Sequence, residues 1–117
     1  MKEKYLVIIP VSKEAYLKQF TSTDRAVQLI TEKAGTQTPD NHITNFFDTP
    51  MFIFSRHEGK SNKTVNERAT YIAVMPSDEE NIYGPAVLIG NADGCIDGFT
   101  LEKAEKIRDE INELRAG

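Results

Sequence analysis

The apolar positions along this 117-residue chain fall first into short, continuous runs. Residues 4–10 are aliphatic and largely β-branched and stop at Pro10, which is typical of a buried strand. Residues 86–89 are apolar at every position, so we expect a central strand that is covered on both faces. Residues 11–20 fit a helical face and a strand about equally well, and both interpretations stay open.

Two longer segments have the period of an amphipathic helix. In residues 24–34, one apolar stripe lies between a capping residue, Thr23, and a glycine stop, Gly35. A second helix is predicted to begin after the capping residue Thr100 and to reach about Leu114. Its apolar residues recur at spacings of three or four and form one stripe that would face the core: Leu101, Ala104, Ile107, Ile111 and Leu114.

The remaining segments predict further strands joined by turns. Residues 43–47 and 51–55 have strand character, with a break at residues 48–50. Residues 58–60 predict a turn of the kind found in hairpins. Residues 65–75 have strand character from Thr70 onward, and the acidic stretch that follows predicts a loop.

These elements add up to an α+β domain, a mostly antiparallel sheet of about five strands with two helices packed on it. Residues 1–117 suit one globular domain with one hydrophobic core. Hydrophobic residues make up 39% of the chain and charged residues 27%, which excludes a disordered protein. The one cysteine, Cys95, cannot form an internal disulfide, which fits a reducing compartment.

Charge and hydropathy narrow the choice of partners. The N-terminal apolar run is too short for a signal peptide, and no stretch approaches the roughly 20 apolar residues of a membrane span, so we expect a cytoplasmic protein without a membrane partner. The net charge is −4, and residues 76–98 hold acidic side chains and no basic one. No basic stripe suits nucleic acid, and we expect the acidic 76–98 region to bind a protein.

The stretch at residues 90–98, GNADGCIDG, resembles the centre of a calcium-binding EF-hand loop. If Gly94 is the glycine at the sixth position, the first and twelfth positions fall on Ile89 and Thr100, which cannot supply the required ligands. We therefore predict no EF-hand, and we interpret the stretch as a polar connection between a strand and a helix. The two histidines, His42 and His57, lack companions at metal-ligand spacing, so no zinc site is expected. A weak Mg²⁺ or Ca²⁺ site at Asp93 and Asp97 stays open as an alternative to the polar connection, but we predict no metal site and no cofactor.

Three polar residues near the predicted strands are candidates for ligand binding. The side-chain amide of Asn66 and the guanidinium of Arg68 could converge on a carboxylate or phosphate, with Tyr83 beside them. Asp93 and Asp97 could complete the same pocket. The structural interpretation stays open beside this one, with Asn66 fixing a turn and Arg68 pairing with a carboxylate. No residue is predicted to be catalytic.

Three runs of sequence resemble the family called domain of unknown function 3846. They are VNERAT at residues 65–70, IYGPAVLIG at residues 82–90 and GFTL at residues 98–101. The resemblance covers most of residues 43–107, whereas residues 36–50 are longer than the family pattern. Members of this family are small proteins of bacteria, phages and other mobile elements, and the family has no activity that could be transferred to this chain.

The resemblance implies a small cytoplasmic accessory protein of a phage or other mobile element. Small acidic proteins in that setting often bind a host protein, so we expect a non-enzymatic protein-binding module, with an anti-defence role as one form of it. The alternative is a small-molecule or nucleotide binder or enzyme with a polar pocket around Asn66, Arg68 and Tyr83. The oligomeric state is left open between a monomer and a homodimer.

Overall fold

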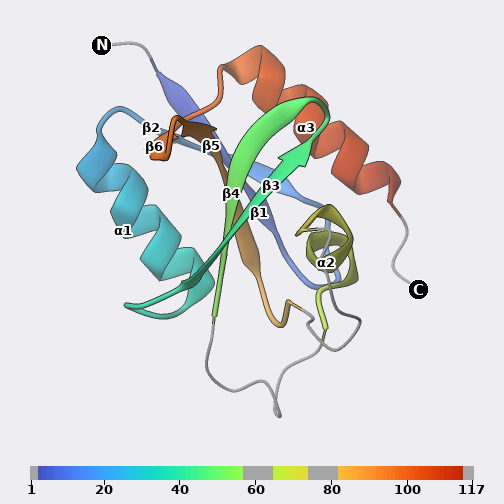
Figure 1. The fold of residues 1–117 in the computed structure, drawn as a ribbon. Helices are drawn as coiled ribbons and strands as arrows, with labels where there is room; N and C mark the ends of the chain where they lie inside the picture. The colour runs from blue at the N-terminus through green and yellow to red at the C-terminus, as the bar shows by residue number, and fades with distance from the viewer. Residues whose placement is uncertain (1–2, 57–64, 74–81, 115–117) are drawn as a thin grey trace.

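A computed structural model describes residues 3–56, 65–73 and 82–114. Within these ranges the chain forms three β-hairpins, each followed by a helix (Figure 1). The elements are β1 (Lys4–Ile9), β2 (Tyr16–Phe20), α1 (Thr23–Ala34), β3 (Asp40–Phe46), β4 (Thr49–Ser55), α2 (Glu67–Ala73), β5 (Ala86–Ala92), β6 (Cys95–Asp97) and α3 (Leu101–Glu113). None of the helices in these ranges is long and apolar enough to cross a membrane.

All six described strands belong to one antiparallel sheet with the order β2-β1-β5-β4-β3, and β6 pairs with β5. β5 is the central strand. Its residue Gly90 pairs with Met51 of β4 on one side and with Asp97 of β6 on the other. β1 and β6 therefore lie along the same edge of β5. β1 pairs with the first half of that edge, residues 86–88, and β6 pairs with the second half, residues 90–92. β2 and β3 are left as the outer strands.

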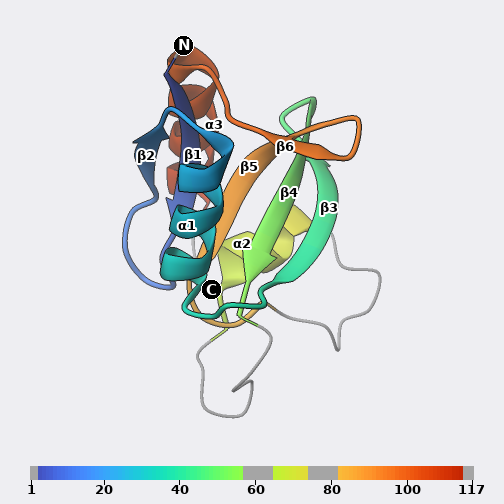
Figure 2. The ribbon, with the colours of Figure 1, turned by 90° about the vertical axis from the view of Figure 1, so that its left-hand side faces the viewer.

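Helices cover both faces of the sheet, α1 on one face and α2 and α3 on the other (Figure 2). The α1 layer buries Leu6 and Ile8 of β1 with Val87 and Ile89 of β5, whereas the opposite layer buries the alternate residues of the same strands. This alternation follows from the two-residue period of a strand. Both faces of β5 are therefore covered, which confirms the expectation for residues 86–89.

The predicted fold class is confirmed in its coarse form, because the protein is α+β with an antiparallel sheet. The described residues contain six strands and three helices, where about five strands and two helices were expected. The ambiguous residues 11–20 contain the strand β2. The expected turn at residues 58–60 and the acidic loop at residues 77–81 lie outside the described residues.

The third helix is a correction to the sequence analysis, since residues 67–73 form α2 and not a strand. Ala69, Ile72 and Ala73 lie on one face of this helix and are buried against the sheet. Their spacing of three and four residues suits a helix. Burial of that face outweighs the preference of Thr70, Tyr71 and Ile72 for strands, as tertiary packing commonly does.

The helix boundaries differ little from those predicted. α1 begins at Thr23, and Ser22 is its N-cap, one residue before the expected one, with Oγ accepting a hydrogen bond from the backbone N–H of Arg25. Thr100 caps α3 as predicted, and its Oγ1 accepts from the N–H of Lys103.

Two of the hairpins turn through two residues that both have positive φ. The values are 56° and 54° at Phe47 and Asp48, and 53° and 88° at Asp93 and Gly94, as in a type I′ turn. The stretch at residues 90–98 is therefore a hairpin and not the predicted strand-to-helix loop. The dipeptide Asp-Gly is a preferred type I′ sequence, and Asn91 Oδ1 supports the turn by accepting from the N–H of Gly94 at 2.7 Å.

Candidate functional site

Asn66 is completely buried, and its side chain joins three parts of the chain. Its Nδ2 donates to the carbonyl oxygens of Ile9 at 2.8 Å and Gly84 at 2.9 Å. Its Oδ1 accepts from the N–H of Ala69 at 3.2 Å and so caps the start of α2. The amide thus ties the end of β1 and the approach to β5 to the first turn of α2.

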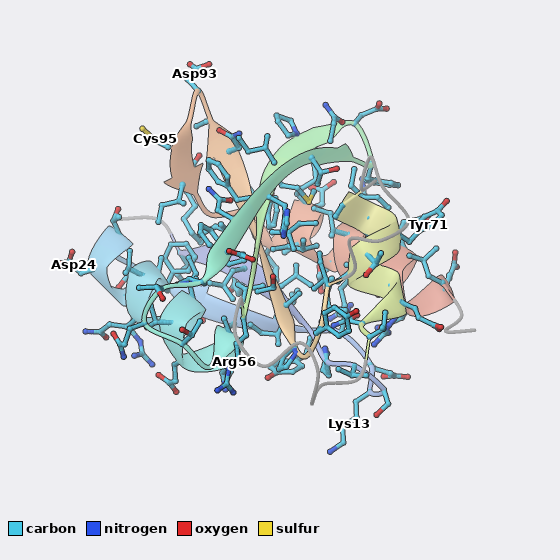
Figure 3. All side chains as sticks on the ribbon, turned by 60° about the horizontal axis from the view of Figure 1, so that its bottom comes forward. Lys13, Asp24, Arg56, Tyr71, Asp93 and Cys95 are labelled. Atoms are coloured by element: carbon cyan, nitrogen blue, oxygen red, sulfur yellow. The ribbon has the colours of Figure 1, made fainter. Side chains whose placement is uncertain are left out.

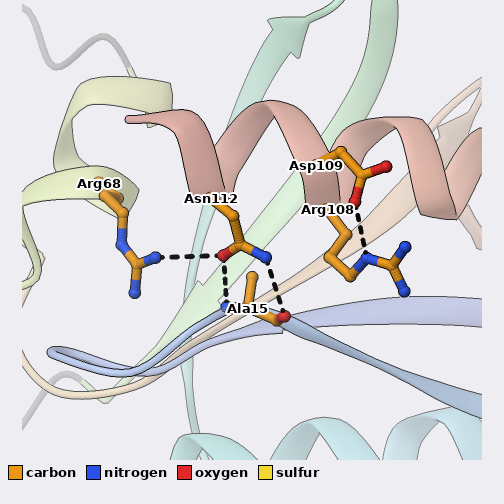
Figure 4. Close-up of polar contacts among 5 residues, drawn as sticks. All are labelled: Ala15, Arg68, Arg108, Asp109 and Asn112. Atoms are coloured by element: carbon orange, nitrogen blue, oxygen red, sulfur yellow. Dashed lines mark hydrogen bonds and ion pairs between the residues drawn. The ribbon is translucent and has the colours of Figure 1, made fainter. Parts of the chain in front are cut away.

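Arg68 is the second residue of α2 and is also buried, with 8% of its surface exposed. Its Nη2 donates to the backbone carbonyls of Pro10 and Lys13, and its Nη1 donates to Asn112 Oδ1 at 3.4 Å. Asn112 in turn holds the backbone of Ala15, accepting from its N–H at 2.7 Å and donating to its carbonyl at 3.4 Å (Figure 4). Arg68 therefore links α2, α3 and the connection between β1 and β2.

Tyr83 lies in the same region as Asn66. It is half-buried and forms an isolated β-bridge with Val65, the residue before Asn66. Asn66 and Tyr83 therefore meet at the segment that leads into β5, whereas the guanidinium of Arg68 binds the connection between β1 and β2.

Asp93 and Asp97 lie on the hairpin of β5 and β6. Asp93 occupies the exposed tip (Figure 3), and Asp97 Oδ1 lies 3.6 Å from Lys4 Nζ. Their neighbour Cys95 is exposed. Among the described residues, no group of three acidic, histidine or cysteine side chains is arranged to hold a metal ion.

The five candidate residues form two groups at opposite ends of β5. Asn66 binds the carbonyl of Gly84, just before β5 begins, and Asp93 follows its last residue. Seven extended residues span roughly 20 Å, which separates the two groups. Figure 3 shows the same separation, since Asp93 lies far from Lys13, whose carbonyl Arg68 binds. The five side chains do not share one pocket.

Two small hollows accompany these groups. One has a volume of about 200 Å³ and lies at the start of α1, lined by Phe20, Ser22 and Ile96 and by the Lys4–Asp97 pair. The other has a volume of about 280 Å³ and is lined by Lys13, Glu14, Arg68, Asn112 and Leu114 among others. Both are smaller than the roughly 300 Å³ at which typical ligand pockets begin.

The end of the sheet that carries both two-residue turns is a second candidate. Because Met51 pairs with Gly90, the turns at residues 47–48 and 93–94 project from the same end. Lys103 near the start of α3 also reaches this end, with Nζ 5.7 Å from the centre of the Phe47 ring. We call the exposed residues Phe47, Asp48 and Asp93 the hairpin end.

Phe47 was missed by the sequence analysis. A bulky aromatic residue with φ of 56° is unusual, because side chains with a Cβ adopt the left-handed region at a cost of roughly 1–2 kcal/mol. The turn could not be identified from the sequence, because Phe-Asp is not a preferred type I′ dipeptide and residues 48–50 were taken as the break. Asn112 was missed as well, since a polar residue on a helix gives no sign of its distant partners.

In comparisons with known proteins, no family model, no curated protein and no solved structure matches this chain. The resemblance to domain of unknown function 3846 therefore stays a prediction.

The hydrogen bonds of Asn66 predict a large effect on stability. Replacing Asn66 with Ala leaves the carbonyls of Ile9 and Gly84 buried without a donor and removes the cap of α2. We expect Asn66→Ala to lower the free energy of unfolding by about 2–4 kcal/mol in urea denaturation. The matched control is Gln37→Ala, an exposed amide residue between α1 and β3, with an expected change below about 0.5 kcal/mol. Equal effects of the two substitutions would contradict this role.

Phe47 is expected to contribute little to stability. Phe47→Asn removes the contact with Lys103, which is worth about 0.5–1 kcal/mol at an exposed site, but relieves a similar cost of left-handed backbone. The free energy of unfolding should therefore stay within about 0.5 kcal/mol of the unsubstituted protein in the same urea titration. A loss of about 2 kcal/mol or more would identify Phe47 as a packing residue.

Proposed function

We propose that this protein is a non-enzymatic protein-binding module that holds its partner at the hairpin end. The observation that carries the proposal is Phe47, an aromatic side chain 42% exposed on a backbone with φ of 56°. Asn or Gly would occupy this turn at lower cost. Unfavourable backbone conformations cluster at functional sites, and exposed aromatic residues often anchor protein interfaces.

The chemistry of the hairpin end suggests the character of the partner. Asp48 and Asp93 are exposed at the two turns and outnumber Lys103, whose Nζ lies 5.7 Å from the centre of the Phe47 ring. A partner would therefore offer basic side chains around an apolar pocket for Phe47. Asp93 belongs to the acidic 76–98 region that the sequence analysis assigned to a protein partner. Association driven partly by these carboxylates would weaken as salt is added.

The resemblance to domain of unknown function 3846 supplies the biological setting of the proposal. In that setting the protein is a cytoplasmic accessory factor of a phage or other mobile element, and its partner is a host protein. In one form of this function, the protein binds a host defence protein and so acts against host defence.

The alternative is a binder of small anionic molecules in the hollow beside Arg68. Lys13 and Arg68 both line that hollow and outnumber its one acidic residue, Glu14, which favours an anion. However, Arg68 already donates to two backbone carbonyls and to Asn112, and Asn66 is completely buried with its amide bonded to backbone groups. We therefore rank this alternative below protein binding.

The test of the proposal is affinity capture with substituted proteins. Immobilised protein is exposed to lysate of the native host at low salt, and retained proteins are eluted with a salt gradient and identified by mass spectrometry. We expect Phe47→Asn to weaken retention of the specific partner about 30-fold, the loss of one anchor residue worth about 2 kcal/mol. Asp93→Asn should move its elution to lower salt.

Tyr71 provides the matched control. It is an aromatic residue 65% exposed on α2, and Figure 3 shows it away from Asp93. Tyr71→Asn should retain the partner as well as the unsubstituted protein does. A partner that binds Phe47→Asn and the unsubstituted protein equally, or no specifically retained protein at all, would refute the proposal.

A further inference from the structure

We infer that two copies of this protein pair along β3 and form a symmetric dimer with one continuous sheet. This inference is independent of the partner proposed for the hairpin end, because it rests on the backbone of β3 and on Ile43. Within the part of the chain that the structure describes, β3 pairs with β4 and no strand pairs with its outer edge.

The turn at residues 47–48 determines which backbone groups of β3 point outward. In a two-residue hairpin, Phe46 and Thr49 exchange hydrogen bonds, and every second pair after them does the same. The next pair, Asn45 and Pro50, then exchanges no backbone hydrogen bonds. Pro50 fits this position, because proline has no N–H to donate. The N–H and C=O groups of Asn41, Ile43 and Asn45 therefore face the outer edge.

α2 covers β3 on one face of the sheet, where Thr44 Oγ1 donates to the carbonyl of Ile72 at 2.8 Å, but the described residues of β3 lack two other features that commonly protect an edge strand. Its seven residues pair with β4 without a bulge, and residues 40–46 contain neither Lys nor Pro. The other outer strand, β2, is shorter and has Lys18 at its centre. Antiparallel pairing of two β2 strands would place Lys18 opposite Lys18, which is unfavourable. Self-association is therefore expected at β3 and not at β2.

A two-fold axis at Ile43 gives complementary pairing over the whole of β3. Asn41 then lies opposite Asn45, and the one charged residue of the strand, Asp40, lies opposite Phe46, so no like charges meet. Ile43, which is 69% exposed, lies opposite its own copy and becomes covered. The three outward-facing residues of each strand would form about six backbone hydrogen bonds across the axis.

The face of the sheet that carries Ile43 leaves room for the side chains of a second copy of β3. Ile43 pairs across the strands with Phe52, so both side chains lie on the face that carries α1. Figure 2 shows α1 over the opposite side of this face, away from β3. In the dimer the two Ile43 side chains would meet on this open part of the face, close to the half-buried Phe54. Pairing through one strand is a small interface, so we expect a Kd in roughly the micromolar range.

Sedimentation equilibrium over a range of protein concentrations tests the dimer. The expected mass rises from 13.2 kDa, that of one chain, towards twice that value as concentration increases. Ile43→Lys places two ammonium groups opposite each other and should weaken association at least about tenfold. The control is Val27→Lys, which alters a residue 47% exposed on α1 and should leave the dimer unchanged. Far-ultraviolet circular dichroism checks that both variants are folded.

The register is tested by disulfide cross-linking in a Cys95→Ser background. Hydrogen-bonded antiparallel pairs have Cα atoms about 5.5 Å apart, which a disulfide can bridge. Under oxidised glutathione, Ile43→Cys should cross-link with itself, and Asn41→Cys should cross-link with Asn45→Cys but not with itself. The inference is overturned by a protein that stays monomeric at every concentration. It is also overturned by a dimer that Ile43→Lys leaves intact, or by one in which Ile43→Cys does not cross-link.

Discussion

The structure depends on the burial of β5 on both faces and its pairing along both edges. Ala86–Ile89 are apolar and fully buried, so helices must cover both faces of the sheet at this point. Their backbone groups also need partners on both sides, which β1, β4 and β6 supply. Gly90 permits the return of the chain, because a Cβ there would lie 2.4 Å from the carbonyl oxygen of Asp97. With the sheet centred in this way, β2 and β3 remain as its outer strands.

Buried polar side chains hold the elements that the sheet alone does not fix. A helix of seven residues such as α2 is too short to be stable by itself in water. Asn66 caps it, and Arg68 anchors it to Asn112 of α3 and to the connection between β1 and β2. Asn66 and Arg68 therefore hold α2 and α3 together on one face of the sheet. The two surfaces that we propose for contacts with other molecules, the hairpin end and the outer edge of β3, lie elsewhere.

The parts of the fold predicted from sequence are those whose burial pattern is local. A continuous apolar run identifies β1 and β5 as strands, and a helical period of apolar residues identifies α1 and α3 as helices. α2 was misassigned because its short β-branched stretch forms a helix only when Asn66 caps it and Ile72 packs on the sheet. Asn66 and Arg68 were recognised as unusual polar residues, but their partners are backbone groups distant in sequence. Phe47 could not be recognised, since its conformation depends on the register of β3 and β4.

Among the described strands, none pairs with the outer edge of β3, and we have proposed that a second copy of the protein does so. Native-state hydrogen exchange of individual amides at several protein concentrations tests it most directly. We expect slow exchange at Val87–Ile89 at every concentration, and slow exchange at His42 and Thr44, whose backbone groups bond to β4. Exchange at Asn41, Ile43 and Asn45 should be fast in dilute protein and should slow as concentration rises. Protection of these three amides at the lowest concentration, or its absence at the highest, would rule out pairing of two copies along β3.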